Sequence, residues 1–342
     1  MAETLCPYFG KCGGCLYQDR SYEEELSLKE DQIRELLQTG LGLSPHIFSA
    51  VVPSSNPYHY RSRLDLTFKR IRGRMELGSN GLGTQQMVAV ESCAIARSET
   101  SDFLPELKEL AAKRLPENYR GANLVVKTGG DGKIRWGGIG RRSLRLPESE
   151  YFWTEIEGKK IFYSLDCFFQ ANLGILPRLM STLRSLLRLN SETVLLDLYA
   201  GVGLFWVVFA HEVKQVFAIE ECESSVQVAD FNRRYHNLSH VVLKQGRIED
   251  SLDEIMQSLS ETQKAGIVDP PRKGLSPEAL QKLVKAHSIN PLVYISCQPA
   301  SLARDLEEFI QNGWQIDQII PFDFFPRTRH LEVVVRLHHG TI

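Results

Sequence analysis

The hydrophobic positions along the chain follow two patterns, and the change between them falls near residue 166. Beyond that point a helical stretch at 175–189 is followed by short apolar runs that alternate with helical segments. The runs are TVLLDLYA, QVFAIE, HVVLKQG, AGIVDPP and LVYISC. This alternation predicts a doubly wound α/β sheet. The closing stretch, QIDQIIPFDFFPRTRHLEVVVRL, predicts two strands joined by a proline-containing loop, as an antiparallel hairpin at the sheet edge.

The first half of the chain has a mixed pattern. Residues 21–42 predict an amphipathic helix, because their apolar positions recur at near-helical spacing, and residues 101–115 predict a second helix. Short alternating strands are predicted for LDLTFKRIR, NLVVKTGG, KIRWGG and KKIFYSLD. This is an α+β unit rather than a βαβ repeat. We therefore predict two domains, residues 1–165 and 166–342.

Composition places the chain in the globular class, with 43% hydrophobic and 24% charged residues. The N-terminal sequence MAETLCPYFG has neither the basic nor the apolar region of a signal peptide. No apolar stretch is long enough to span a bilayer. We therefore expect a cytoplasmic protein without membrane partners. Its seven cysteines then favour metal ligands or catalytic thiols over a disulfide framework.

Charge is informative only locally, because the formal net charge is −2. Residues 60–74 carry six basic side chains and one acid, and residues 133–145 carry five basic side chains and no acid. Both stretches have aromatic residues in or beside them, namely Tyr58, Tyr60, Phe68 and Trp136. Such stretches suit an RNA backbone with stacked bases, and the alternative is a pair of solvated strand faces.

A cofactor site is predicted at the ends of several strands of the second half. The run LLDLYAGVGLF joins an apolar strand to an apolar helix through Gly201 and Gly203, and glycines let the backbone approach a ligand closely. Glu220 ends the next strand, where an acid suits the two hydroxyls of a ribose. Asp269 and two prolines form a stiff loop at the carboxyl edge, and Gln170 in FFQAN could hydrogen-bond the cofactor. The alternative is a set of purely structural turns.

Two further residues are candidates for catalysis. Cys297 ends the strand LVYISC, and a thiol at that edge of the sheet is well placed to act as a nucleophile. A strand-end cysteine can equally be buried and inert. Glu332 precedes the last strand and becomes a candidate base if the preceding loop folds back onto the cleft. Otherwise it is an exposed residue at the start of a strand.

The N-terminal cysteines suggest a metal site. Cys6, Cys12 and Cys15 have the spacing C-x5-C-G-G-C, which lacks the paired ligands of a usual zinc finger. Three close thiolates with a distant fourth suit an iron–sulfur cluster. Cys93 is the best fourth ligand, because it lies in the same half of the chain. Zinc remains an alternative.

Taken together, these motifs resemble the RNA uracil-5-methyltransferase family, in particular its iron–sulfur branch, which methylates 23S ribosomal RNA. The run C-x5-C-G-G-C-x2-Q with a later cysteine is similar to the cluster motif of that branch. FFQAN, DLYAGVG, DPPRKG, SCQPASLARDL and HLE resemble the family's F-Q-x-N, D-L-Y-C-G-x-G, D-P-P-R-x-G, S-C-N-P-x-T-x-A-R-D-L and H-x-E. The resemblance implies a class I methyltransferase (Rossmann-like) C-terminal domain. It also implies an N-terminal α+β domain that carries a 4Fe–4S cluster.

The resemblance also implies a role for each candidate residue. Cys297 would be the nucleophile and Glu332 the base. S-adenosylmethionine would be bound by Gln170, Tyr199, Gly201, Glu220 and Asp269. The cluster would be held by Cys6, Cys12, Cys15 and Cys93. The implied reaction is methylation of carbon 5 of a uridine in RNA through a covalent adduct with Cys297. No DNA partner is expected, and the oligomeric state is left open.

The sequence departs from the family at a few positions. Leu204 stands where an asparagine often follows the glycine turn, and Arg247 stands near a position where an acid or amide commonly faces the adenine. The contacts to adenosine are therefore expected to differ. No β-barrel domain precedes the cysteines, so RNA is expected to bind the central domain and the cluster region.

Alternative functions stay open. One is uridine-5 methylation of tRNA by the same chemistry. Another is RNA cytosine-5 methylation, but that family places a cysteine in the loop after the fourth strand, and DPPR has none. The third is a non-catalytic iron–sulfur protein that binds RNA or senses redox state.

Overall fold

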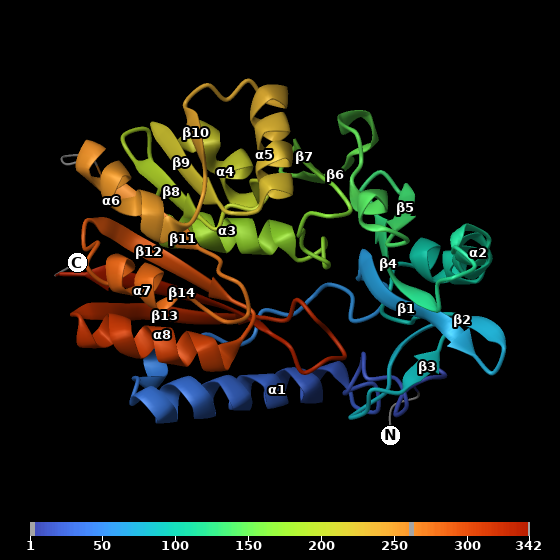
Figure 1. The fold of residues 1–342 in the computed structure, drawn as a ribbon. Coiled ribbons are helices and arrows are strands. Elements are labelled where there is room, and N and C mark those ends of the chain that lie inside the picture. Colours follow the sequence, from blue (N-terminus) through green and yellow to red (C-terminus); the bar gives the residue numbers. More distant parts are fainter. Residues whose placement is uncertain (1–3, 260–262, 341–342) are drawn as a thin grey trace.

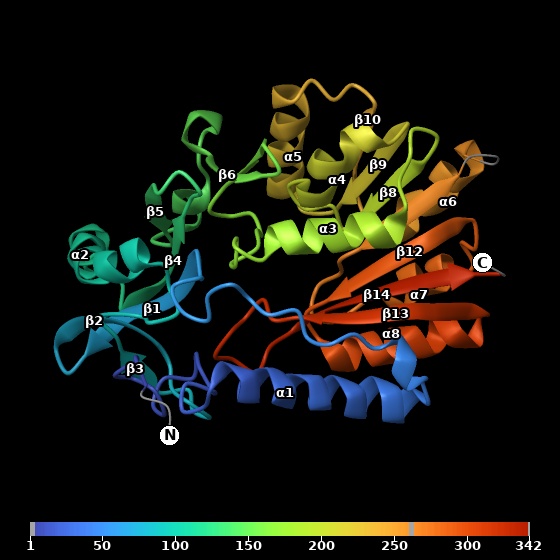
Figure 2. The ribbon, with the colours of Figure 1, turned by 180° about the vertical axis from the view of Figure 1, so that it is seen from behind.

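A computed structural model describes residues 4–259 and 263–340 of the chain. Within these residues the strands form a seven-stranded sheet, a five-stranded sheet and a two-stranded ribbon. Figures 1 and 2 show the large sheet between helices on its two faces, with the smaller sheet beside it. In the described part of the chain, no helix is both long and apolar enough to cross a membrane.

The large sheet is built from the C-terminal half and runs in the order β10-β9-β8-β11-β12-β14-β13. Its first five strands are parallel, and β14 is antiparallel to both of its neighbours. The strands are β8 (Val194–Leu198), β9 (Gln215–Glu220), β10 (Val241–Gln245), β11 (Lys264–Val268), β12 (Ile289–Ser296), β13 (Trp314–Phe322) and β14 (Glu332–His339). The predicted doubly wound sheet and closing hairpin are confirmed, although only β13 of that hairpin is an edge strand.

Helices cover both faces of this sheet because its strands are apolar on both sides. One face packs against α3 (Leu176–Leu187), α4 (Leu204–Phe209) and α5 (Glu223–Tyr235). The other packs against α6 (Ile248–Ser258), α7 (Pro277–Leu283) and α8 (Pro299–Gln311). The parallel strands all point their carboxyl ends to one edge, where open α/β sheets bind ligands.

The smaller sheet has the order β3-β2-β1-β4-β5 and is antiparallel throughout. Its elements are β1 (Arg63–Ile71), β2 (Arg74–Asn80), β3 (Met87–Ala89), β4 (Gly121–Thr128) and β5 (Ile134–Gly137), with α2 (Ser98–Arg114) on one face. Leu66 and Phe68 of β1 share a core with Leu104 and Leu107 of α2. The α+β character predicted for this region is confirmed.

The side-chain alternation along β1 overturns one part of the RNA prediction. Phe68 is fully buried against α2, and Tyr60 is buried with its hydroxyl donating to the Pro326 carbonyl at 3.0 Å. Trp136 is partly buried in the same core under the guanidinium of Arg114. Because neighbouring side chains point to opposite faces of a strand, Phe68 packs inward from β1 while Lys69 lies on the opposite face. Tyr60 and Phe68 are therefore not platforms for stacked bases.

Helix α1 (Tyr22–Ile33) begins at a capping box. Ser21 Oγ accepts from the Glu24 amide at 3.1 Å, and Glu24 Oε2 accepts from the Ser21 amide at 2.8 Å. The helix continues into a π-helical segment, Arg34–Thr39, and Leu37 joins the core beneath α6, α7 and α8. Figures 1 and 2 show α1 running beneath the large sheet on the side of α8.

The remaining elements are short. They are β6 (Phe152–Ile156), β7 (Lys159–Tyr163) and the 3-10 turns Pro45–Ile47, Arg141–Leu144, Glu148–Glu150 and Ala210–Glu212. The domain boundary between residues 165 and 166 stays a prediction, and hydrophobic packing crosses it. Phe152 and Ile161 belong to the core of the large sheet, as does Leu37 from the N-terminal helix.

Candidate active site

Three of the predicted residues meet at the carboxyl edge of the large sheet. Strands β12 and β14 pair antiparallel up to Ser296 and Val333. Cys297 directly follows Ser296 and Glu332 directly precedes Val333, and the charge of Glu332 is close enough to raise the pKa of the Cys297 thiol. Asp269 directly follows β11, the neighbour of β12 on its other side. The sheet thus brings together a thiol and two carboxyls that lie up to 63 positions apart in the sequence.

Burial sets the electrostatics of this group. Glu332 is 4% exposed, and its pKa lies well above the usual value because of burial and the nearby Asp269 carboxyl. Burial raises the pKa of Asp269 to about 7. Burial, followed by the charge of Glu332, raises the pKa of the Cys297 thiol to about 11. The thiol of Cys297 and the carboxyls of Asp269 and Glu332 therefore favour their neutral forms, and a cation bound nearby would favour their ionised forms.

The glycine turn after β8 has an unusual backbone that fixes its shape. Tyr199, Gly201 and Gly203 have φ values of 69°, 55° and 100°. A Cβ at Gly203 would lie 2.3 Å from the Trp206 ring, so only glycine fits there. This glycine turn helps to orient Glu220. The Glu220 carboxylate accepts hydrogen bonds from the Gly201 amide at 2.9 Å and from the Cys222 amide at 2.7 Å.

A cavity of about 550 Å³ lies beside this turn. Its lining includes Tyr199, Glu220, Arg247, Glu249 and Pro271. That volume suits a small-molecule ligand, and the lining carries both acidic and basic side chains. Arg247, where the sequence departs from the family, lines the cavity and is ion-paired with Glu249.

Other predicted residues lie outside the lining of this cavity. Gly201, Asp269 and Gln170 are not part of it, and Leu204 is buried at the start of α4. Gln170 is 4% exposed, and its Oε1 has no hydrogen-bond partner among the described residues. Two residues on, the Asn172 amide donates to the Phe324 carbonyl at 3.1 Å. Gln170 therefore lies two residues from Asn172, which contacts the loop that leads to Glu332.

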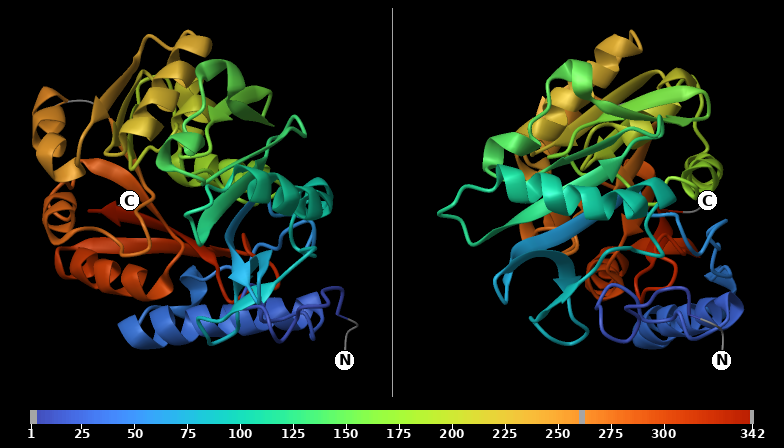
Figure 3. Two further views of the ribbon diagram at one scale, coloured as in Figure 1. Left: turned by 45° about the vertical axis from the view of Figure 1, so that its right-hand side comes forward. Right: turned by 90° about the vertical axis from the view of Figure 1, so that its right-hand side faces the viewer.

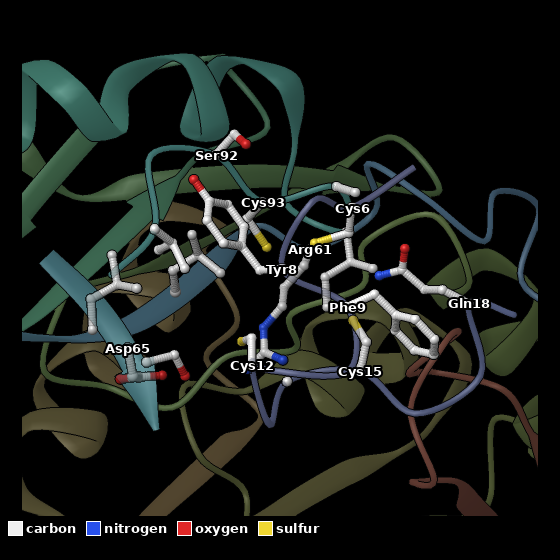
Figure 4. A pocket seen from close by; sticks show the side chains of 17 residues that line it. Cys6, Tyr8, Phe9, Cys12, Cys15, Gln18, Arg61, Asp65, Ser92 and Cys93 are labelled. Carbon is white, nitrogen blue, oxygen red and sulfur yellow. The ribbon is translucent and has the colours of Figure 1, made fainter. Parts of the chain in front are cut away.

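The four cysteines proposed as ligands line a second cavity, of about 100 Å³. Figure 4 shows the sulfur atoms of Cys6, Cys12, Cys15 and Cys93 around one space, with the guanidinium of Arg61 among them. All four are free thiols, and burial raises the pKa of Cys15 to about 12. Among the described residues, no three or more His, Cys, Asp or Glu side chains converge closely enough to hold a metal ion.

Three residues with a clear place in these sites were not predicted as site residues. Asp197, the penultimate residue of β8, is fully buried, and burial raises its pKa to about 8. Arg272 is close enough to lower the pKa of both Cys297 and Glu332. Gln18 is 1% exposed and lines the cysteine cavity. Each stands inside a motif recognised in the sequence, but its burial and neighbours depend on the fold.

The fold and the strand-end groups define a class I methyltransferase that carries a thiol next to a carboxyl. A sequence profile of the tRNA (Uracil-5-)-methyltransferase family matches residues 148–340, more than half of the chain. The chain belongs to this family and is an RNA uracil-5-methyltransferase.

Similar proteins span nearly the whole chain. An uncharacterized RNA methyltransferase of Caldanaerobacter subterraneus subsp. tengcongensis is 30% identical, over 97% of this chain and 84% of that protein. A tRNA (uracil(54)-C(5))-methyltransferase of Schizosaccharomyces pombe is 29% identical, over 97% of this chain and 65% of that protein. The crystal structure of a tRNA (uracil-54, C5)-methyltransferase of Pyrococcus abyssi with S-adenosyl-L-homocysteine has the same fold. Its TM-score is 0.73 at 21% identity, and the match covers 95% of this chain and 85% of that one. The predicted family and methyltransferase fold are thereby confirmed.

Proposed function

We propose that the protein transfers a methyl group from S-adenosylmethionine to carbon 5 of a specific uridine in RNA, through a covalent adduct with Cys297. The observation that supports this proposal is the pairing of Ser296 in β12 with Val333 in β14, because these residues are the chain neighbours of Cys297 and Glu332. A nucleophile and a proton acceptor on one edge suit a reaction that needs both in succession.

The chemistry follows from the weak nucleophilicity of carbon 5. Addition of the Cys297 thiolate to carbon 6 makes carbon 5 enolate-like, so that carbon 5 attacks the methyl group of the sulfonium. Glu332 then removes the hydrogen from carbon 5, and elimination releases Cys297. The target base must leave its stack to reach this edge.

Electrostatics supports a cationic cofactor in the adjacent cavity. Glu220 is oriented by two backbone amides and suits the ribose hydroxyls. The sulfonium charge would favour the ionised forms of Asp269 and Glu332, whose pKa values burial raises. The cofactor would thus help to ionise the base before the RNA reacts. Tyr199, Gly201 and Gln170 complete the proposed cofactor set.

We expect labelled methyl groups from S-adenosylmethionine to appear in RNA as 5-methyluridine. The substrate we favour is 23S ribosomal RNA, because the N-terminal cysteine motif resembles that of the ribosomal branch. The second candidate is tRNA, because one relative is a tRNA (uracil(54)-C(5))-methyltransferase. Mass mapping of both RNAs from a deletion strain decides between them. Absence of the product from both would contradict the proposal.

We further propose that Cys6, Cys12, Cys15 and Cys93 hold a 4Fe–4S cluster. Their side chains surround one cavity rather than one point, which suits a body of several atoms better than a single zinc ion. Both amide atoms of Gln18 are buried in the wall of this cavity, next to the thiol of Cys15. A sulfide would give the amide N–H an acceptor. The cluster would serve to tie the N-terminal segment to the central domain.

Purified without oxygen, the protein is expected to contain about four iron and four acid-labile sulfide per chain. Cys93→Ser should lose most of this iron, because it removes the ligand that comes from outside the N-terminal segment. Cys222→Ser is the matched control, since Cys222 is exposed and outside the cavity. Zinc without sulfide, or full iron in Cys93→Ser, would contradict the cluster.

A further inference from the structure

Arg327 occupies an exceptional place in the loop that leads from β13 to Glu332. It is an arginine with only 6% of its surface exposed. Its backbone is left-handed, with φ of 66°, a conformation that a side chain rarely adopts without support. Nothing in the family chemistry described above uses this residue, and its contacts show what holds it.

Both the backbone carbonyl and the guanidinium of Arg327 form hydrogen bonds with the segment that follows Cys15. Its carbonyl accepts from the Leu16 amide at 2.7 Å and from the Tyr17 amide at 3.2 Å. Its guanidinium Nη1 donates to the carbonyls of Arg20 at 3.0 Å and Tyr17 at 3.3 Å. Figures 1 and 3 show this loop reaching from the large sheet to the N-terminal segment. The cysteine segment therefore contacts the loop directly.

Helix α1 holds the same loop through buried charges. The Arg327 amide donates to Glu25 Oε1 at 2.7 Å. The Lys29 ammonium lies 2.7 Å from Glu25 and 2.7 Å from Asp323, at the start of the loop, and Lys29 and Glu25 are fully buried. The Tyr22 hydroxyl donates to Asp323 at 2.8 Å. The Arg327 guanidinium also lies 3.5 Å from Glu25 Oε2, so two acids, Glu25 and Asp323, face two bases, Lys29 and Arg327, in one buried network.

Three other carbonyls of the loop accept hydrogen bonds from side chains outside it. Asn172 donates to that of Phe324, Lys29 to that of Phe325 and Tyr60 to that of Pro326. These contacts come before Arg327, whereas Glu332 comes five residues after it. Arg327 is therefore the point where the cysteine segment can determine the course of the chain toward the proposed base.

We propose that Arg327 is a positioning residue that places Glu332 by joining its loop to the cysteine segment. This inference rests on the proposed role of Glu332 as the base. Without the guanidinium contacts the loop would settle differently, and a displacement of about 1 Å can cost a reaction step about 100-fold. The addition of Cys297 and the methyl transfer depend on β12 and on the cofactor cavity, so they should suffer less. The specific consequence is slow release of the methylated RNA from Cys297.

The test compares Arg327→Met with Arg327→Lys and with the matched control Arg34→Met. Arg34 lies just after α1, where it pairs with Glu30 at 2.9 Å, and within the described part of the chain it makes no hydrogen bond or ion pair with the loop. Single-turnover reactions with labelled cofactor are followed on denaturing gels, which separate free RNA from the covalent adduct. Cofactor affinity is measured in parallel to confirm a folded cofactor site.

We expect Arg327→Met to bind the cofactor within about twofold of the unmodified protein, to form the adduct, and to resolve it at least about tenfold more slowly. Arg327→Lys should fall between the two, because an ammonium can still donate to the Tyr17 and Arg20 carbonyls. Arg34→Met should resolve the adduct at the unmodified rate. Slow resolution with intact cofactor binding would support the proposal.

Resolution at the unmodified rate in a folded Arg327→Met variant would overturn it. If that variant does not bind the cofactor, Arg327→Lys decides in its place: slowed resolution supports the proposal, and an unchanged rate overturns it. Failure of the proposed function is recognised separately, because Glu332→Gln would then give no adduct in the same assay, whatever Arg327 does.

Discussion

Replacing Cys297 with alanine is expected to abolish methylation of RNA, with a loss of rate of at least about 10³-fold, because it removes the thiol that forms the proposed adduct. Cys297 directly follows β12 and does not line the 550 Å³ cavity, so the affinity for S-adenosylmethionine should remain within about twofold. Transfer of labelled methyl groups to RNA measures the first effect. Equilibrium binding of the cofactor measures the second.

The pH dependence offers a further check on the unmodified protein. Because burial raises the pKa of the Cys297 thiol to about 11, the thiolate fraction grows as the pH rises through neutrality. The rate of adduct formation should therefore increase with pH over this range. Cys222→Ala is the matched control, because this exposed thiol should be dispensable. Full activity in Cys297→Ala would overturn the assignment of the nucleophile.

Replacing Glu332 with glutamine should leave the enzyme trapped on its RNA. The amide keeps the shape of the carboxyl but cannot take the hydrogen from carbon 5, so methyl transfer proceeds and elimination does not. We expect most of the enzyme to migrate as a covalent RNA complex on denaturing gels, and turnover to fall by at least about 10²-fold. The trapped base should already carry the new methyl group, which mass spectrometry of the digested complex can verify.

The control for this variant is Glu307→Gln, on the exposed face of α8. It removes an acid from a helix that follows Cys297 and should change neither turnover nor adduct level. If Glu332→Gln turned over normally, Glu332 would not be the base. Asp269, whose carboxyl faces Glu332 closely enough to raise its pKa, would then become the candidate.

The elements of the large sheet could be predicted from the sequence because each depends on a local pattern. Runs such as VLLDL and LVYIS are apolar at every position, which is typical of parallel strands covered on both faces. Gly203 could be recognised as part of a turn, and its φ of 100° explains why a glycine is needed. The candidates Cys297, Asp269 and Glu332 were found because each stands next to such a run.

The packing of α1 and of the aromatic rings could not be predicted in the same way. The pattern of residues 21–42 indicates a helix, but it does not indicate that this helix packs beneath the large sheet instead of the smaller one. The residues around Phe68 have the basic composition of an RNA-binding strand, but the Phe68 ring faces α2. Which face of a strand is covered depends on a partner that is distant in sequence, and local patterns do not contain that information.

The sequence by itself determined the succession of strands and helices, the residue types at the strand ends, and the spacing of the N-terminal cysteines. Only the tertiary structure decided which of them meet. The antiparallel return of β14 beside β12 sets Glu332 next to Cys297, and burial of that pair alters the pKa values of both. The buried charges between α1 and the loop at Arg327 likewise join residues about 300 positions apart. Such contacts arise because folding removes these charged and polar groups from water. Each buried group must then find its partner within the protein.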